Sequence, residues 1–283
     1  MNRCAHLRST ATEEIGVIDP HPTIVAAAIA LGMLALPASL AHADDTTLVE
    51  TGSTLIYPLF NVWASEYTKT HPGVRITTGR TVSAAGIEQA TSGAAHIGTS
   101  DAYMTDAQAK RNPQIINVPM AISALTVNYN LPGLNTTNLK LDGPVLVGIY
   151  TGKIRSWDHK AIVALNPGVT LPHHEIVPVR RTDGSGDTYV FTQYLTFSTQ
   201  SWEDKVGYGT SIAWPTVPGN LGAEGNLGVL QAIQQTPYAM GYLGISLRTE
   251  IANAQLGTAL LKSYSGEFLL PTPESIAAAA ASL

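Results

Sequence analysis

The stretch Arg180-Arg181-Thr182-Asp183-Gly184-Ser185-Gly186-Asp187-Thr188 decides how we interpret the chain around it. An apolar run of strand type, residues 175–179, comes directly before it. Residues 189–195, which follow it, have the apolar spacing of a helix. The pattern therefore predicts a strand, a tight glycine-rich turn and the start of a helix.

A turn of this kind favours an oxyanion. The first N–H groups of a helix have no intrahelical partner, and its dipole is positive at that end. Arg181 precedes the turn, and arginine suits bidentate contact with phosphate or carboxylate. Ser185 and Thr188 add hydroxyl groups. Asp183 and Asp187 fit beside an anion if one orients Arg181 and the other caps the helix.

Other functions of this turn fail on spacing. A phosphate-binding P-loop requires Lys where the chain has Asp187, and a nucleophile elbow requires Gly where it has Asp183. A calcium-binding EF-hand loop requires Gly and Glu where Thr188 and Tyr194 stand. An ordinary capped helix with a surface arginine stays open as the alternative interpretation.

Composition limits the class of protein. The 283 residues provide one large domain or two of ordinary size, and 45% hydrophobic with 13% charged residues indicates a globular protein with a core. The net charge is −5, and no basic stripe occurs, so we expect no nucleic acid partner. An anion site in such a chain must depend on local geometry.

The first 43 residues resemble a targeting segment. Residues 23–40 are an apolar run, and Ala41-His42-Ala43 is a small-x-small cleavage signal. We predict a signal peptide over residues 1–43, with an uncleaved anchor as the alternative, and hence a periplasmic or cell-surface location. Cys4, the single cysteine, would leave with it, and no internal disulfide is possible.

Three strands after the leader are each predicted to end in polar residues. The first, from residue 49, breaks at Gly52, and Ser53 or Thr54 can cap a helix over residues 57–69. The second, residues 74–78, leads through a small-residue turn over residues 81–86, which contains Ser83, to a helix over residues 87–91. The third, residues 96–101, ends in Asp101. In parallel α/β sheets such ends converge on a ligand crevice.

These motifs together resemble a known family. The segments concerned are Glu50-Thr51-Gly52-Ser53-Thr54-Leu55, Ser83-Ala84-Ala85-Gly86-Ile87, Gly98-Thr99-Ser100-Asp101 and Arg181-Thr182-Asp183-Gly184-Ser185-Gly186. In order and spacing, residues 48–270 are similar to the phosphate-binding proteins (PstS) of high-affinity phosphate ABC transporters. The resemblance implies an α/β, two-lobed periplasmic-binding-protein-like fold of type II, with the ligand cleft between the lobes.

The resemblance also implies a phosphate site. Its residues are Thr54, Leu55, Ser83, Asp101, Arg181, Asp183, Ser185, Gly186, Asp187 and Thr188. Asp183 would hold Arg181 in place. The family commonly has Thr at position 187, so either Thr188 supplies that hydroxyl or the Asp187 N–H alone serves.

Asp101 gives the expected selectivity. Phosphate carries a proton at neutral pH and sulfate does not, so a buried carboxylate accepts a hydrogen bond from phosphate. Against sulfate it meets a lone pair, which costs several kcal/mol in a dry site. One charged acceptor among many donors thereby rejects the wrong anion.

The division into lobes is predicted from strands and breaks. We expect a first lobe over residues 44–130, a crossing near Leu131, and a second lobe over residues 131–283 that includes a strand at 145–149. Residues 219–226 are interpreted as a flexible surface loop. The chain stops inside an Ala-rich helix over 275–283. The segment that returns to the first lobe in the family is therefore expected to be absent, through truncation or in a shorter family member.

The predicted function is capture of inorganic phosphate and its delivery to the membrane permease subunits of an ABC transporter. We expect a monomer without enzymatic activity, cofactor or metal, since His173-His174 has no third ligand nearby. A binding protein for another tetrahedral oxyanion such as sulfate, a phosphatase, and a non-functional remnant are the alternatives.

Overall fold

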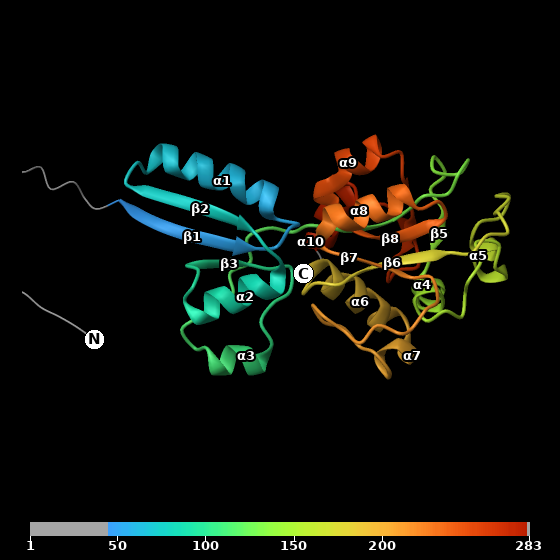
Figure 1. Ribbon diagram of the computed structural model, residues 1–283, viewed down its shortest axis with the longest axis horizontal. Helices are drawn as coiled ribbons and strands as arrows, with labels where there is room; N and C mark the ends of the chain where they lie inside the picture. The colour runs from blue at the N-terminus through green and yellow to red at the C-terminus, as the bar shows by residue number, and fades with distance from the viewer. Residues whose placement is uncertain (1–44, 282–283) are drawn as a thin grey trace, which may run out of the picture. The chain divides into compact units, whose positions relative to one another are not determined.

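A computed structural model describes residues 45–281, so the predicted signal peptide lies outside the described residues. A three-stranded parallel sheet, called here the small sheet, has the order β2-β1-β3. Its strands are β1 (Thr46–Gly52), β2 (Val74–Arg80) and β3 (Ile97–Thr99). Helix α1 (Tyr57–Thr70) packs along β2, and α2 (Ser83–Ser92) packs along β3 and β1 (Figure 1).

The three strands of the small sheet have their carboxyl ends at the same edge. Gly52, the last residue of β1, pairs with Arg80 at the end of β2 and with Thr99 at the end of β3. The turns that follow these strands therefore begin at one edge of the sheet. Gly52 has a φ of 145°, and a Cβ added there would lie 1.9 Å from the Thr99 carbonyl oxygen, so a side chain has no room at this crossing.

A five-stranded mixed sheet, called the large sheet, has the order β7-β6-β8-β4-β9. Its strands are β4 (Leu125–Tyr129), β6 (Val177–Arg181), β7 (Leu221–Ala223), β8 (Ala239–Gly244) and β9 (Gly257–Thr258). Strand β6 runs parallel to β7 and β8, whereas β4 is antiparallel to β8 and β9. Arg181 pairs with Ala223, so β6 and β7 also end together.

Helices and short strands complete the described chain. The helices are α3 (Asp106–Arg111), α4 (Gly143–Tyr150), α5 (Lys160–Leu165), α6 (Gly186–Ser198), α7 (Gln200–Glu203), α8 (Gly225–Gln235), the 3₁₀-helix η1 (Ile245–Leu247), α9 (Arg248–Asn253) and α10 (Pro273–Ala280). Strands β5 (Lys140–Leu141), β10 (Leu260–Lys262) and β11 (Phe268–Leu269) form a third sheet. None of the described helices is both long enough and apolar enough to span a membrane.

Two apolar clusters bury the faces of the large sheet. One contains Trp157, Phe191 and Tyr242, and rings of Phe191 and Tyr242 stack with centroids 4.4 Å apart. The other contains Val179 and Ile233 and packs β6 and β8 against α8. Burial on both faces fixes the strand β6 and therefore the position of Arg181 at its end.

The structure corrects two expectations. Strand β4 was expected in the first lobe, before a crossing near Leu131, but it pairs with β8 and β9 in the large sheet. Residues 127–129 are buried, as suits an internal strand. Residues 145–149, expected as a strand, lie in α4, where the Asp142 side chain accepts a hydrogen bond from the Val145 N–H and Pro144 occupies the first turn.

Candidate anion-binding site

The turn after β6 places Arg181 at the start of α6. Arg181 is 3% exposed, which excludes the surface arginine of the alternative interpretation. Its backbone N–H donates to the Tyr242 hydroxyl at 3.1 Å. Ser185 is the N-cap of α6, and its Oγ accepts a hydrogen bond from the Thr188 N–H at 3.1 Å. A buried cation therefore lies beside a capped helix N-terminus.

Two aspartates of the same turn hold the guanidinium. Arg181 Nε and Nη2 donate to the two carboxylate oxygens of Asp183 at 2.6 and 2.5 Å, so Asp183 holds Arg181 as predicted, through a bidentate pair. Arg181 Nη1 donates to Asp187 Oδ2 at 2.8 Å. The prediction that one of the aspartates caps the helix is wrong, because Ser185 has that role.

A third carboxylate comes from the edge of the small sheet. Ser53 Oγ lies 2.6 and 2.7 Å from the two oxygens of Asp101, and Ser83 Oγ donates to Asp101 Oδ2 at 3.1 Å. Burial raises the pKa of Asp101, while the hydrogen bonds from Ser53 and Ser83 lower it. The small sheet thus supplies an acceptor surrounded by hydroxyl donors.

The helix α6 approaches Asp101 closely at Gly186. A Cβ atom at Gly186 would lie 2.2 Å from Asp101 Oδ2 and 2.3 Å from Ser83 Oγ. The backbone also joins these turns, since the Ala84 N–H donates to the Gly184 carbonyl at 3.0 Å. Only glycine at position 186 permits this approach.

Asn226, at the start of α8, connects the two edges. Its Nδ2 donates to Thr54 Oγ1 at 3.0 Å and to Asp187 Oδ2 at 2.8 Å, and its Oδ1 accepts from the Gly244 N–H at 2.9 Å. It is 1% exposed. Residues 219–226 are therefore not a flexible surface loop: they contain β7 and the start of α8.

Sequence reasoning missed Asn226 and Ser53 as site residues. Ser53 was considered only as a helix cap, and its Oγ does accept from the Leu55 N–H at 3.1 Å. Asn226 lies in the first turn of an apolar helix, directly after Gly225, and polar side chains at a helix start often bind unpaired groups nearby. This position at the start of a helix was the sequence feature that could have identified Asn226 as a site residue.

The hydroxyl of Thr188 has another partner. Thr188 Oγ1 lies 2.7 Å from the Tyr242 hydroxyl, and both atoms are buried in the large-sheet side of the site. The idea that Thr188 supplies the hydroxyl of the last anion contact therefore lacks support from its position. The Asp187 N–H, in the first turn of α6, has no intrahelical partner and remains the donor at this point.

The titration of Asp187 is shifted. Burial is the largest cause and the negative charge of Asp101 the second, and they raise its pKa to about 6 against the lowering effect of Arg181 and Asn226. The site thus combines one cation, three carboxylates, hydroxyl groups and a helix N-terminus. This set can bind a tetrahedral oxyanion through neutral donors, with the carboxylates accepting protons.

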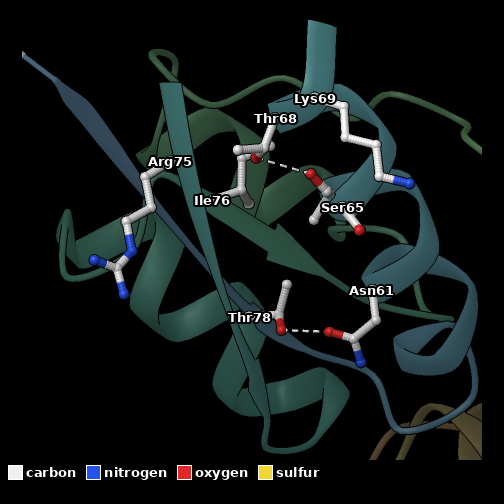
Figure 2. A pocket seen from close by; sticks show the side chains of 8 residues that line it. Asn61, Ser65, Thr68, Lys69, Arg75, Ile76 and Thr78 are labelled. Atoms are coloured by element: carbon white, nitrogen blue, oxygen red, sulfur yellow. Dashed lines mark hydrogen bonds between the residues drawn. The ribbon is translucent and has the colours of Figure 1, made fainter. Parts of the chain in front are cut away.

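A separate hollow of about 460 Å³ lies between α1 and β2 and contains none of these residues. Figure 2 shows Thr78 and Asn61 joined across it, and the charged ends of Arg75 and Lys69 extending in opposite directions. No cations converge there to match Arg181. Within residues 45–281, no three His, Cys, Asp or Glu side chains are placed to hold a metal ion.

Comparisons with known proteins place the chain in a family. A family model described as PBP superfamily domain matches residues 37–281. Phosphate-binding protein PstS of Methanocaldococcus jannaschii is 35% identical over 239 residues, 81% of this chain and 60% of that protein. Phosphate-binding protein PstS of Haemophilus influenzae is 33% identical over 242 residues, 86% of this chain and 70% of that protein.

A solved structure shows the same fold. It is a putative phosphate ABC transporter substrate-binding protein with bound phosphate from Clostridium perfringens, with a TM-score of 0.62, 20% identity and coverage of 83% of this chain and 82% of that one. The likeness confirms the predicted α/β fold of a two-lobed binding protein. The chain spans 60% of the length of the Methanocaldococcus relative.

Proposed function

This chain belongs to the phosphate-binding protein (PstS) family of the PBP superfamily, and we propose that it captures inorganic phosphate outside the cytoplasm and delivers it to the permease of an ABC transporter. The observation that carries the proposal is Arg181, buried at the N-terminus of α6 and 3% exposed. A buried guanidinium beside unpaired helix N–H groups is suited to an oxyanion.

The proposed contacts come from both sheets. From the small-sheet side they are the Thr54 hydroxyl, the Leu55 backbone, Ser83 and Asp101. From the large-sheet side, Arg181 is held by Asp183, and the N-terminal turn of α6 adds Ser185, Gly186 and the Asp187 N–H. We add Ser53, which binds Asp101, and Asn226, which binds Thr54.

Asp101 is proposed to select phosphate over sulfate. It accepts hydrogen bonds from Ser53 and Ser83 and, when ionised, can only accept, so a protonated phosphate oxygen can replace or join those donors. Sulfate brings no proton, and its oxygen against the carboxylate is repelled. Delivery of phosphate rather than sulfate follows from this one acceptor.

Calorimetric titration of the purified chain, freed of bound anion, tests the function. We expect saturable phosphate binding and sulfate binding weaker by about 2 kcal/mol or more, the cost of an unsatisfied buried acceptor. Stronger binding of sulfate would assign the site to another oxyanion. No binding of either anion would reject the function.

We propose that the chain binds and releases its ligand without changing it chemically. Ser185, the candidate nucleophile, uses its Oγ as the cap of α6 rather than facing a base. Incubation with a chromogenic phosphate ester should release no chromophore at catalytic rates. We further propose a monomer exported by cleavage after Ala43, which light scattering and N-terminal sequencing of the exported protein test.

A further inference from the structure

Asp187 stands out among the carboxylates of the site. It is 1% exposed, and its Oδ2 accepts from Arg181 Nη1 and from Asn226 Nδ2, each at 2.8 Å. Its other oxygen, Oδ1, is buried and has no hydrogen-bond partner among the described residues. An ionised carboxylate with an unsatisfied buried oxygen is costly, which marks Oδ1 as a place for a proton.

The charges around Asp187 favour the same conclusion. Its own turn presents Arg181 and Asp183, the small-sheet edge presents Asp101, and β8 presents the Tyr242 hydroxyl. Asn226 of α8 is neutral. One cation therefore faces three carboxylates, and an incoming anion adds further negative charge to a buried site. Such a site binds an anion better when one carboxylate is neutralised.

We propose that Asp187 takes up a proton as the anion binds, so that anion capture by this chain is coupled to protonation. The inference rests on the proposed function and adds the ionic form in which the site works. The proton comes from solvent, is held on Asp187 Oδ1, and returns to solvent when the anion leaves. No covalent bond to the anion forms or breaks.

The site can still bind an anion when Asp187 is protonated and neutral. Oδ2 retains both of its donors, Arg181 and Asn226, when the proton is on Oδ1. The guanidinium keeps its bidentate partner Asp183 and so remains charged and in place. Burial and the Asp101 charge already raise the pKa of Asp187 to about 6, and a bound anion raises it further.

Calorimetry of phosphate binding in buffers of different ionisation enthalpy measures the coupled protons. At pH 7.5 we expect the unmodified chain to take up more protons than Asp187→Asn, by up to about one per anion. Phosphate's own titration is present in both proteins and cancels in the difference. Asp106→Asn, which removes an exposed carboxylate on α3, is the matched control and should leave proton uptake unchanged.

Infrared difference spectra of the unmodified chain give a second readout that does not depend on a variant's affinity. Addition of phosphate should produce the C=O stretch of a protonated carboxylic acid. The band should persist in Asp101→Asn and vanish in Asp187→Asn. A band that vanishes only in Asp101→Asn would move the proton to Asp101 and overturn the proposal.

The dependence of affinity on pH completes the test. Above the pKa of free Asp187, the dissociation constant of the unmodified chain should rise more steeply than that of Asp187→Asn, by up to about tenfold per pH unit. Equal slopes and equal proton uptake in the two proteins, with phosphate bound by both, would overturn this inference and leave the proposed function intact. Failure of the unmodified chain to bind phosphate would overturn both.

Discussion

Arg181 shows what sequence can and cannot predict about single residues. Its pairing with Asp183 was predictable, because the two residues lie two apart across a turn and the family resemblance assigns Asp183 to hold this arginine. The partners of Asp187 and Thr188 were not predictable in this way. Asp187 meets Asn226, and Thr188 meets Tyr242, 39 and 54 residues away, so the contacts depend on tertiary packing.

Replacement of Arg181 tests the centre of the site. Arg181→Ala removes the cation and leaves Asp183 and Asp187 without it, so phosphate binding should weaken by about 2–5 kcal/mol, roughly 30-fold or more. Calorimetry measures the loss, and thermal unfolding checks that the protein is folded. Arg180→Ala is the matched control, because Arg180 lies next to Arg181 but lies with Tyr150 and Trp214 rather than with the carboxylates of the site. A change below tenfold for Arg181→Ala would exclude this residue from the anion site.

Asp101→Asn tests the selectivity. The amide keeps the size of the side chain but adds a donor, so it can face an unprotonated oxygen. The affinity for sulfate should rise relative to that for phosphate, by about tenfold if one unsatisfied acceptor of 1–3 kcal/mol is relieved. Competition titrations give the ratio for both proteins. An unchanged ratio would remove Asp101 from the account of selectivity.

The elements were predicted best where turn chemistry marked their ends. The strand, turn and helix around Arg181 are present as β6, a glycine-rich turn and α6. Residues 143–150 form α4, not the expected strand, because the apolar run is buried on all sides and its periodicity cannot distinguish the two. Strand β7 escaped prediction since its backbone pairing with β6, rather than its side-chain pattern, makes it a strand.

Gly186→Ala tests the approach of α6 to the small sheet. The added methyl group would lie 2.2 Å from Asp101 Oδ2, so the two edges must separate. Overpacking of about 1–3 kcal/mol corresponds to phosphate binding weaker by roughly 5- to 150-fold. The helix itself gains from alanine, so the large sheet should stay folded.

Gly73→Ala provides the control for this prediction. Gly73 precedes β2, and an added Cβ there has no atom within 4 Å. The two variants should therefore unfold at similar temperatures and differ only in affinity. Full affinity in Gly186→Ala would mean that the close contact with Asp101 is not part of the binding form.

At the scale of the whole molecule, polar contacts join the two sheet edges. Both apolar clusters of the described chain are built from Leu125 and residues that follow it. They therefore belong to the part of the chain that forms the large sheet. Two hydrogen bonds connect the edges: Asn226 donates to Thr54, and the Ala84 N–H donates to the Gly184 carbonyl. Sequence identified these ends as convergent. It did not place β4 between β8 and β9, because that pairing joins residues far apart in the chain.

Buried carboxylates at this junction make the stability depend on pH. Burial raises the pKa of Asp187 to about 6 and raises those of Asp101 and Glu50 above their ordinary values. The native state therefore binds more protons than the unfolded chain in the range between the unfolded and folded pKa values. The resulting stability is fully present below the unfolded pKa and is lost as the pH rises through the folded pKa.

Without phosphate, the free energy of unfolding should thus increase when the pH falls from about 8 to about 5. A shift of about two units gives about 3 kcal/mol in full only below the unfolded pKa, so Asp187 contributes about 1.4 kcal/mol within this range. Urea unfolding at several pH values measures the slope, and Asp187→Asn should lose its share of the slope while Asp106→Asn keeps all of it. At the acid end, the exposed Asp158 and Glu274 act in the opposite direction, because their lowered pKa values withdraw stability as they protonate. A free energy that stays level or falls between pH 8 and 5 would show that these carboxylates are solvated rather than buried at the junction.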